Sequence, residues 1–111
     1  MKKTILYIFT LIYLSTVPLN GAVYKGQREF SKNCLSCHVK PQELIVTYTM
    51  EEWTEKLDND GDLLAKLHIS NEKAKESWSY FKSGRYIRKL KHLRDFLVEF
   101  AKDSGNVPTC N

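Results

Sequence analysis

The sequence has little that would indicate a membrane-spanning protein, a β-protein or a nucleic-acid-binding protein. After residue 22 no stretch is apolar enough to cross a bilayer, which takes about 20 residues. No stretch alternates convincingly between apolar and polar residues, and no internal repeat is present. Without Lys2 and Lys3, 15 basic and 13 acidic residues remain, and a net charge of about +2 is too mild to argue for nucleic-acid binding. We therefore expect an all-α protein that does not bind nucleic acid.

The first 22 residues follow the order of a secretory signal peptide. Lys2 and Lys3 give a charged start, residues 5–14 form an apolar run, and residues 20–22 offer a plausible cleavage point. The apolar run is short for a membrane span, so an uncleaved anchor is the less favoured alternative. We expect export to the periplasm, with no stable membrane insertion after cleavage. The predicted division is a signal peptide at 1–22, one folded domain at 23–105 and a C-terminal tail at 106–111.

Cysteine is scarce, and two of the three cysteines stand in one motif. The segment Cys34-Leu35-Ser36-Cys37-His38 has the spacing of a c-type haem attachment site. Two cysteines at this spacing can each add to one vinyl group of the same porphyrin edge, and the histidine that follows then reaches the iron. We therefore expect one covalently bound haem c, attached to Cys34 and Cys37, with His38 as the proximal iron ligand.

Two other interpretations of the motif remain open. A pair of this kind can be a thiol redox site, although such a site usually lies on a βαβ unit. It can also be half of a zinc site, but the remaining candidate ligands, His68, His92 and Cys110, are isolated from one another. Cys110 has no obvious partner, so it is either an idle thiol or the site of a disulfide that joins two chains into a dimer.

Apolar periodicity and capping signals predict a domain of four to five helices. Thr49 and Glu52 form a capping box at the start of one helix, which the turn signal at 59–61 should end. Residues 83–84 give a further break signal. The expected helices cover residues 23–32, 49–57, 63–67, 70–81 and 87–102, with a loop at 39–49.

Two features beside the motif resemble small class I c-type cytochromes. Gly26 and Phe30 are placed like the glycine and aromatic residue that such cytochromes use at a helix crossing. Residues 90–102, LKHLRDFLVEFAK, are similar to the terminal helix of that family. The resemblance implies a small cytochrome c-like domain around one covalently bound haem. It also implies an aromatic and leucine contact between the first and last helices, formed by Phe30, Phe96, Leu97 and Phe100.

The middle of the chain departs from that family, which usually supplies a methionine shortly before the last helix. No methionine follows Met50 in this sequence. Residues 37–53, CHVKPQELIVTYTMEEW, followed by LLAKLH, resemble a site in dihaem c-type cytochromes. This second resemblance implies that Trp53 and His68 correspond to the tryptophan and to the second axial histidine of such a site. A single attachment motif means that the second haem of that family is absent.

Four outcomes compete for the sixth position of the iron. His68 follows an apolar run at an expected helix boundary and is the leading candidate, since two imidazoles commonly hold haem iron. Met50 is the second candidate, because a thioether would give the usual electron-carrier pair. His92, at the edge of an apolar stripe, is a weaker candidate. The position could also be open.

The expected function is that of a one-electron carrier rather than an enzyme, although it could be a subunit of a redox enzyme. Its partners would be redox proteins, docking on the stretch from Lys82 to Arg94, which holds six basic residues and no acid. The alternative function is a haem protein with an open or displaceable sixth site. Such a protein would act as a gas sensor or a peroxidase-like enzyme.

Overall fold

The computed structural model describes residues 21–108, and this part of the chain is helical with no strand. The all-α prediction is therefore confirmed for these residues. No helix among them is long and apolar enough to cross a bilayer. Residues 1–20, with most of the expected signal peptide, and residues 109–111, with Cys110, lie outside the described part. The elements are α2 (Gly21–Asn33), α3 (Pro41–Ile45), α4 (Met50–Ile69), the 3-10 helix η1 (Glu72–Ser77), α5 (Trp78–Phe81) and α6 (Gly84–Glu99).

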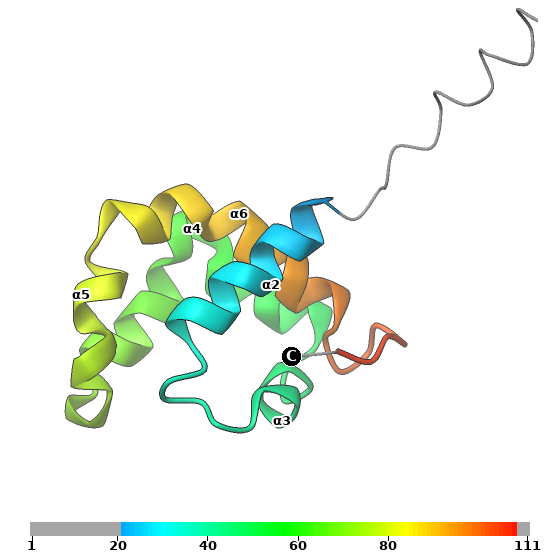
Figure 1. Ribbon diagram of the computed structural model, residues 1–111, viewed down its shortest axis with the longest axis horizontal. Helices are drawn as coiled ribbons and strands as arrows, with labels where there is room; N and C mark the ends of the chain where they lie inside the picture. The colour runs from blue at the N-terminus through cyan, green and yellow to red at the C-terminus, as the bar shows by residue number, and fades with distance from the viewer. Residues whose placement is uncertain (1–20, 109–111) are drawn as a thin grey trace, which may run out of the picture.

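The first and last of these helices, α2 and α6, cross closely (Figure 1). Gly26 is buried at the crossing, where a Cβ would overlap the carbonyl oxygen of His92 and stand 2.6 Å from the Cβ of Phe96. The ring of Phe30 lies against that of Phe96, with 5.4 Å between their centroids. Phe96 in turn contacts Phe100. The crossing of the first and last helices is thus present, with glycine at the point of closest approach.

Helix α4 has the start and the interruption that the sequence predicts. The Thr49 hydroxyl accepts a hydrogen bond from the Glu52 amide, and the Glu52 carboxylate accepts one from the Thr49 amide, which completes the capping box. Residues 59–61 adopt left-handed backbone conformations, so α4 consists of two helical arms. At the bend the Gly61 carbonyl accepts a hydrogen bond of 2.7 Å from the hydroxyl of Tyr86 in α6.

The expected loop at 39–49 is the main error of the prediction, because it contains α3. Pro41 stands in the first turn of this helix, where its fixed φ suits the helix and its missing N–H costs no hydrogen bond. The short helix places Ile45 in the core, fully buried. The Ile45 carbonyl accepts a 2.9 Å hydrogen bond from the indole N–H of Trp53, which ties α3 to the first arm of α4.

The last helix begins and ends three residues earlier than predicted. Ser83 is its N-cap and accepts a hydrogen bond from the Tyr86 amide, so the helix includes Gly84 and the two residues after it. Beyond Glu99 the backbone turns, and the Lys102 amide donates to the carbonyl of Tyr48 instead of continuing the helix. The predicted segment at 70–81 is also divided into η1 and α5.

The crossing predicts a large effect for a single methyl group at Gly26. The change Gly26→Ala should destabilise the fold by about 1–3 kcal/mol, because α2 must move away from the α6 backbone. The matched control is Gly84→Ala, where a Cβ would approach only the guanidinium end of the Arg88 side chain, which can move away, and we expect a change below about 1 kcal/mol. Urea unfolding followed by circular dichroism measures both. Equal free energies of unfolding for the two variants would contradict this description of the crossing.

Candidate functional site

A cavity of about 440 Å³ lies beside the helix crossing and is lined by residues from every described helix, together with the loop after α2. Its volume falls within the range of about 300–1,000 Å³ that is usual for ligand and cofactor sites. Cys34, Cys37 and His38 line this cavity together with His68, so the structure brings the motif and the leading distal candidate to one site. The apolar part of the lining consists mainly of Phe30, Leu44, Trp53, Leu64, Leu67, Phe81, Leu93 and Leu97.

The cysteine motif continues the chain direction of α2 by one further turn. The Cys34 amide donates to the Phe30 carbonyl at 2.9 Å, and the His38 amide donates to the Cys34 carbonyl at the same distance. Because Phe30 is fixed in the helix crossing, the core determines where the motif begins. Cys34 is half-buried and Cys37 is exposed, which leaves the second thiol at the rim of the site.

The imidazoles of His38 and His68 lie close together. Their ring centroids are 6.1 Å apart, and the ring planes are inclined by 78°. An imidazole nitrogen binds a metal ion at about 2 Å, so two rings that share one ion have their centroids about 6 Å apart. The two residues therefore fit the donor set of a metal centre with one histidine on each side, such as a haem iron.

A hydrogen bond to the backbone fixes which nitrogen of His68 is free. Its Nδ1 lies 2.8 Å from the carbonyl oxygen of Leu64. Since a carbonyl only accepts, Nδ1 carries the proton and Nε2 keeps its lone pair for a metal. On the other side, burial and then the neighbouring His68 ring lower the pKa of His38, which favours the neutral, ligating form of that imidazole.

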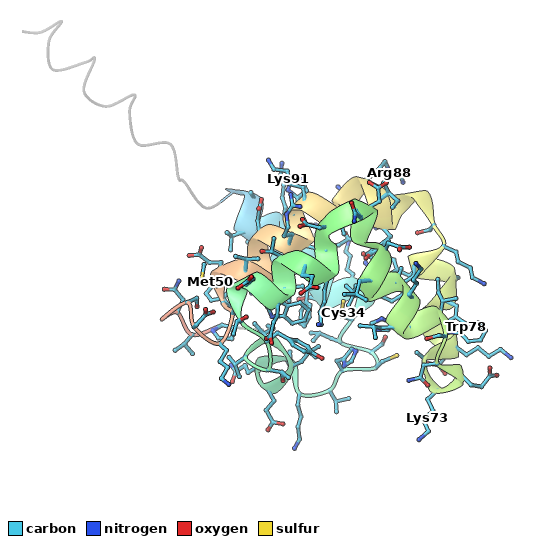
Figure 2. All side chains as sticks on the ribbon, turned by 180° about the vertical axis from the view of Figure 1, so that it is seen from behind. Cys34, Met50, Lys73, Trp78, Arg88 and Lys91 are labelled. Carbon is cyan, nitrogen blue, oxygen red and sulfur yellow. The ribbon has the colours of Figure 1, made fainter. Side chains whose placement is uncertain are left out.

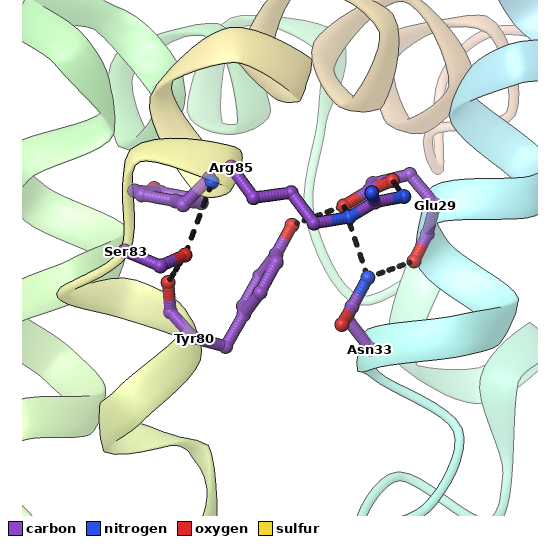
Figure 3. A network of polar contacts seen from close by, with 6 residues as sticks. Glu29, Asn33, Tyr80, Ser83 and Arg85 are labelled. Carbon is purple, nitrogen blue, oxygen red and sulfur yellow. Dashed lines mark hydrogen bonds and ion pairs between the residues drawn. The ribbon is translucent and has the colours of Figure 1, made fainter.

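A buried carboxylate holds the helices around the cavity (Figure 3). Glu29 of α2 is only 3 % exposed and accepts hydrogen bonds from three side chains on other parts of the site. The donors are the Tyr80 hydroxyl at 3.0 Å, the Arg85 guanidinium at 2.9 and 3.2 Å, and the Asn33 amide at 2.9 Å. Burial and the Glu29 charge raise the pKa of Tyr80, so its proton stays in this bond. The network joins α2 to α5 and α6.

The environment of Cys34 differs from that of a reactive redox thiol. Burial, then the charge of Glu29 and then Cys37, raises the pKa of the Cys34 thiol to about 12. A reactive thiol of a redox site instead has a lowered pKa, because the thiolate is the nucleophile. Among residues 21–108 no group of three or more histidine, cysteine, aspartate or glutamate residues is placed to hold a metal ion.

The other two candidates for the sixth ligand lie away from the cavity. Met50 is exposed at the start of α4, and its amide donates to the Asp103 carboxylate. In Figure 2 it stands at the opposite end of the protein from Trp78, with Cys34 between them. His92 lies in α6 against α2, and its Nδ1 is buried without a hydrogen-bond partner in the described part of the chain.

Two arginines of the basic stretch from Lys82 to Arg94 are paired with acidic side chains of other helices. Arg85 is bound to the buried Glu29, and Arg94 lies 3.4 Å from the carboxylate of Asp58 in α4. Arg88 and Lys91 are exposed and lie along one edge of the molecule, on the side away from Lys73 (Figure 2). The stretch contains no acid of its own, but other elements supply acids that neutralise part of it.

Sequence reasoning missed two lysines that line the cavity. Lys56 of α4 and Lys73 of η1 are the basic side chains of the lining, which includes no aspartate or glutamate. The ammonium group of Lys56 also lies 4.1 Å from the centroid of the Tyr48 ring. Lys56 could have been predicted, because residues three apart on a helix lie on the same face and Trp53 was already expected at the site. The position of Lys73 in the lining depends on the turn into η1, which no sequence pattern indicated.

Comparisons with protein-family models, with curated proteins and with solved structures found no match to this chain. Its function therefore has to follow from the chemistry of its own residues. The relevant observations are the cysteine motif, the cavity that it lines, and the two imidazoles that lie 6.1 Å apart within it.

The environments of the two thiols predict unequal reactivity in protein made without haem. At pH 8 iodoacetamide should modify the exposed Cys37 first. Cys34 should react far more slowly, and its rate should rise about tenfold per pH unit, because only the thiolate reacts and its pKa is near 12. Peptide mass spectrometry of timed samples gives both rates, with circular dichroism as the control for folding. Equal rates in folded protein would show that Cys34 is not shielded.

Proposed function

We propose that this protein is a c-type cytochrome that carries one electron at a time, with a single haem attached to Cys34 and Cys37 and ligated by His38 and His68. The observation that carries the proposal is the 6.1 Å separation of the two imidazole rings within a cavity lined by both cysteines. When bound, the haem supplies an iron that alternates between its ferrous and ferric states.

Each group of lining residues has a role in this proposal. The two cysteines hold the cofactor by thioether bonds, and the aromatic and leucine side chains exclude water from it. Lys56 and Lys73 supply positive charge suited to a cofactor that carries two carboxylates, and no acidic side chain of the lining opposes them. The Glu29 network holds the surrounding helices in place, so the two histidines keep their separation.

The position of His68 favours an electron carrier over the alternative function. With an imidazole on each side, the iron has no vacant position for a small ligand, whereas a gas sensor or peroxidase-like enzyme needs one. We further propose that the carrier works in the periplasm, on the basis of the signal-like pattern in residues 1–22. Redox proteins with acidic surfaces are the proposed partners, and the exposed Arg88 and Lys91 are available to dock them.

Covalent attachment can be tested directly. Full-length protein produced in cells that attach c-type haem should keep its colour on the polypeptide in a denaturing gel. Changing both Cys34 and Cys37 to Ser should abolish that colour, because no thioether can form. Wild-type protein that is colourless, with both thiols free to react, would overturn the proposal.

The sixth ligand can be tested with matched histidine variants. His68→Ala should convert the low-spin optical spectrum to a high-spin one and allow rapid binding of carbon monoxide to the reduced protein, because one iron position becomes vacant. His92→Ala and Met50→Ala are the controls, since neither side chain lines the cavity. Both should keep the wild-type spectrum. A high-spin spectrum in either control, with an unchanged His68→Ala spectrum, would assign the ligand elsewhere.

A further inference from the structure

Three contacts that involve side chains hold His68, and they come from both sides of the turn that follows α4. Its Nδ1 bonds to the Leu64 carbonyl within α4, and its ring stacks on that of Phe81 in α5, with 4.2 Å between centroids. Its own carbonyl oxygen accepts a 2.8 Å hydrogen bond from the indole N–H of Trp78, the first residue of α5. The main chain and the ring of this histidine are thus both held by α5.

The indole N–H of Trp78 bridges the two ends of the turn. In addition to its bond with the His68 carbonyl, this N–H lies 3.3 Å from the carbonyl oxygen of Asn71, the N-cap residue of η1. The Asn71 amide also donates to the His68 carbonyl, at 3.1 Å. Helix α4 ends one residue after His68, and carbonyl groups in the last turn of a helix have no intrahelical donor. The Trp78 bond therefore restrains His68 at a point where the helix itself does not.

We propose that Trp78 is a positioning residue that keeps His68 in place as the sixth iron ligand. The inference rests on the proposed function and explains why His68 stays at the sixth position of the iron. Trp78 does not line the cavity and touches no reacting atom, so it acts only through His68. Without its N–H, the last turn of α4 loses a restraint, and His68 leaves the iron more often.

The capping box at the start of α4 offers a control for lost stability. The Thr49 hydroxyl accepts a hydrogen bond from the Glu52 amide, so Thr49→Ala, like Trp78→Phe, removes one hydrogen bond between a side chain and the backbone. Thr49 does not line the cavity, and its bond involves neither histidine. A purely structural effect should therefore appear in both variants, and an effect on the ligand only in Trp78→Phe.

The experiment compares Trp78→Phe with Thr49→Ala in haem-loaded full-length protein. Carbon monoxide is mixed with the reduced protein, and its apparent affinity and binding rate are followed optically, with thermal melting measured separately. For Trp78→Phe we expect about a tenfold gain in apparent affinity, since one lost hydrogen bond shifts the population with His68 displaced by up to that factor. For Thr49→Ala we expect wild-type carbon monoxide binding despite a lower melting temperature.

A second variant keeps the test decisive if Trp78→Phe does not fold. Phe81→Leu removes the ring that stacks on His68 and retains an apolar side chain, and it should also increase carbon monoxide binding. Wild-type binding in a folded Trp78→Phe protein, or an equal increase in Thr49→Ala, would overturn the inference. If instead wild-type protein lacks low-spin haem, or His68→Ala does not open the site, the proposed function itself fails.

Discussion

The close approach of α2 to α6 at Gly26 is the constraint on which the rest of the structure depends. With glycine at this position the α2 backbone contacts the α6 backbone directly, and the adjacent Phe30 can reach Phe96. This contact fixes the axis of α2. Because the Cys34 amide bonds to the Phe30 carbonyl, the axis determines where the first thiol enters the cavity. A local steric requirement therefore sets the geometry of the site.

The two histidines reach the site by different routes, and each is fixed by its local backbone. His38 follows the turn that extends α2. His68 ends the second arm of α4, which points toward the cavity because the left-handed residues 59–61 redirect the chain and Tyr86 holds the bend. The two segments are far apart in the sequence, but α6 packs against both helices and relates them to each other.

The sequence predicts those parts of the fold that depend on residues close together in the chain. The capping box at Thr49 and the break at 59–61 depend on residues within one turn of each other, and both are present. Helix α3 was missed because it is only five residues long and has no side-chain cap at its start, so it leaves little local signal in the sequence. The Glu29 network was missed because two of its partners, Tyr80 and Arg85, stand 51 and 56 residues along the chain.

The pairing of α2 with α6 also has a consequence for how the chain is made. These helices are the first and the last of residues 21–108 to be synthesised, so their contact closes a long loop and forms late. Until α6 is in place, α2 has no partner for its apolar face, and the cysteines that follow it remain accessible. Under the proposed function, haem would therefore be attached most readily to a chain whose core has not yet closed over Cys34.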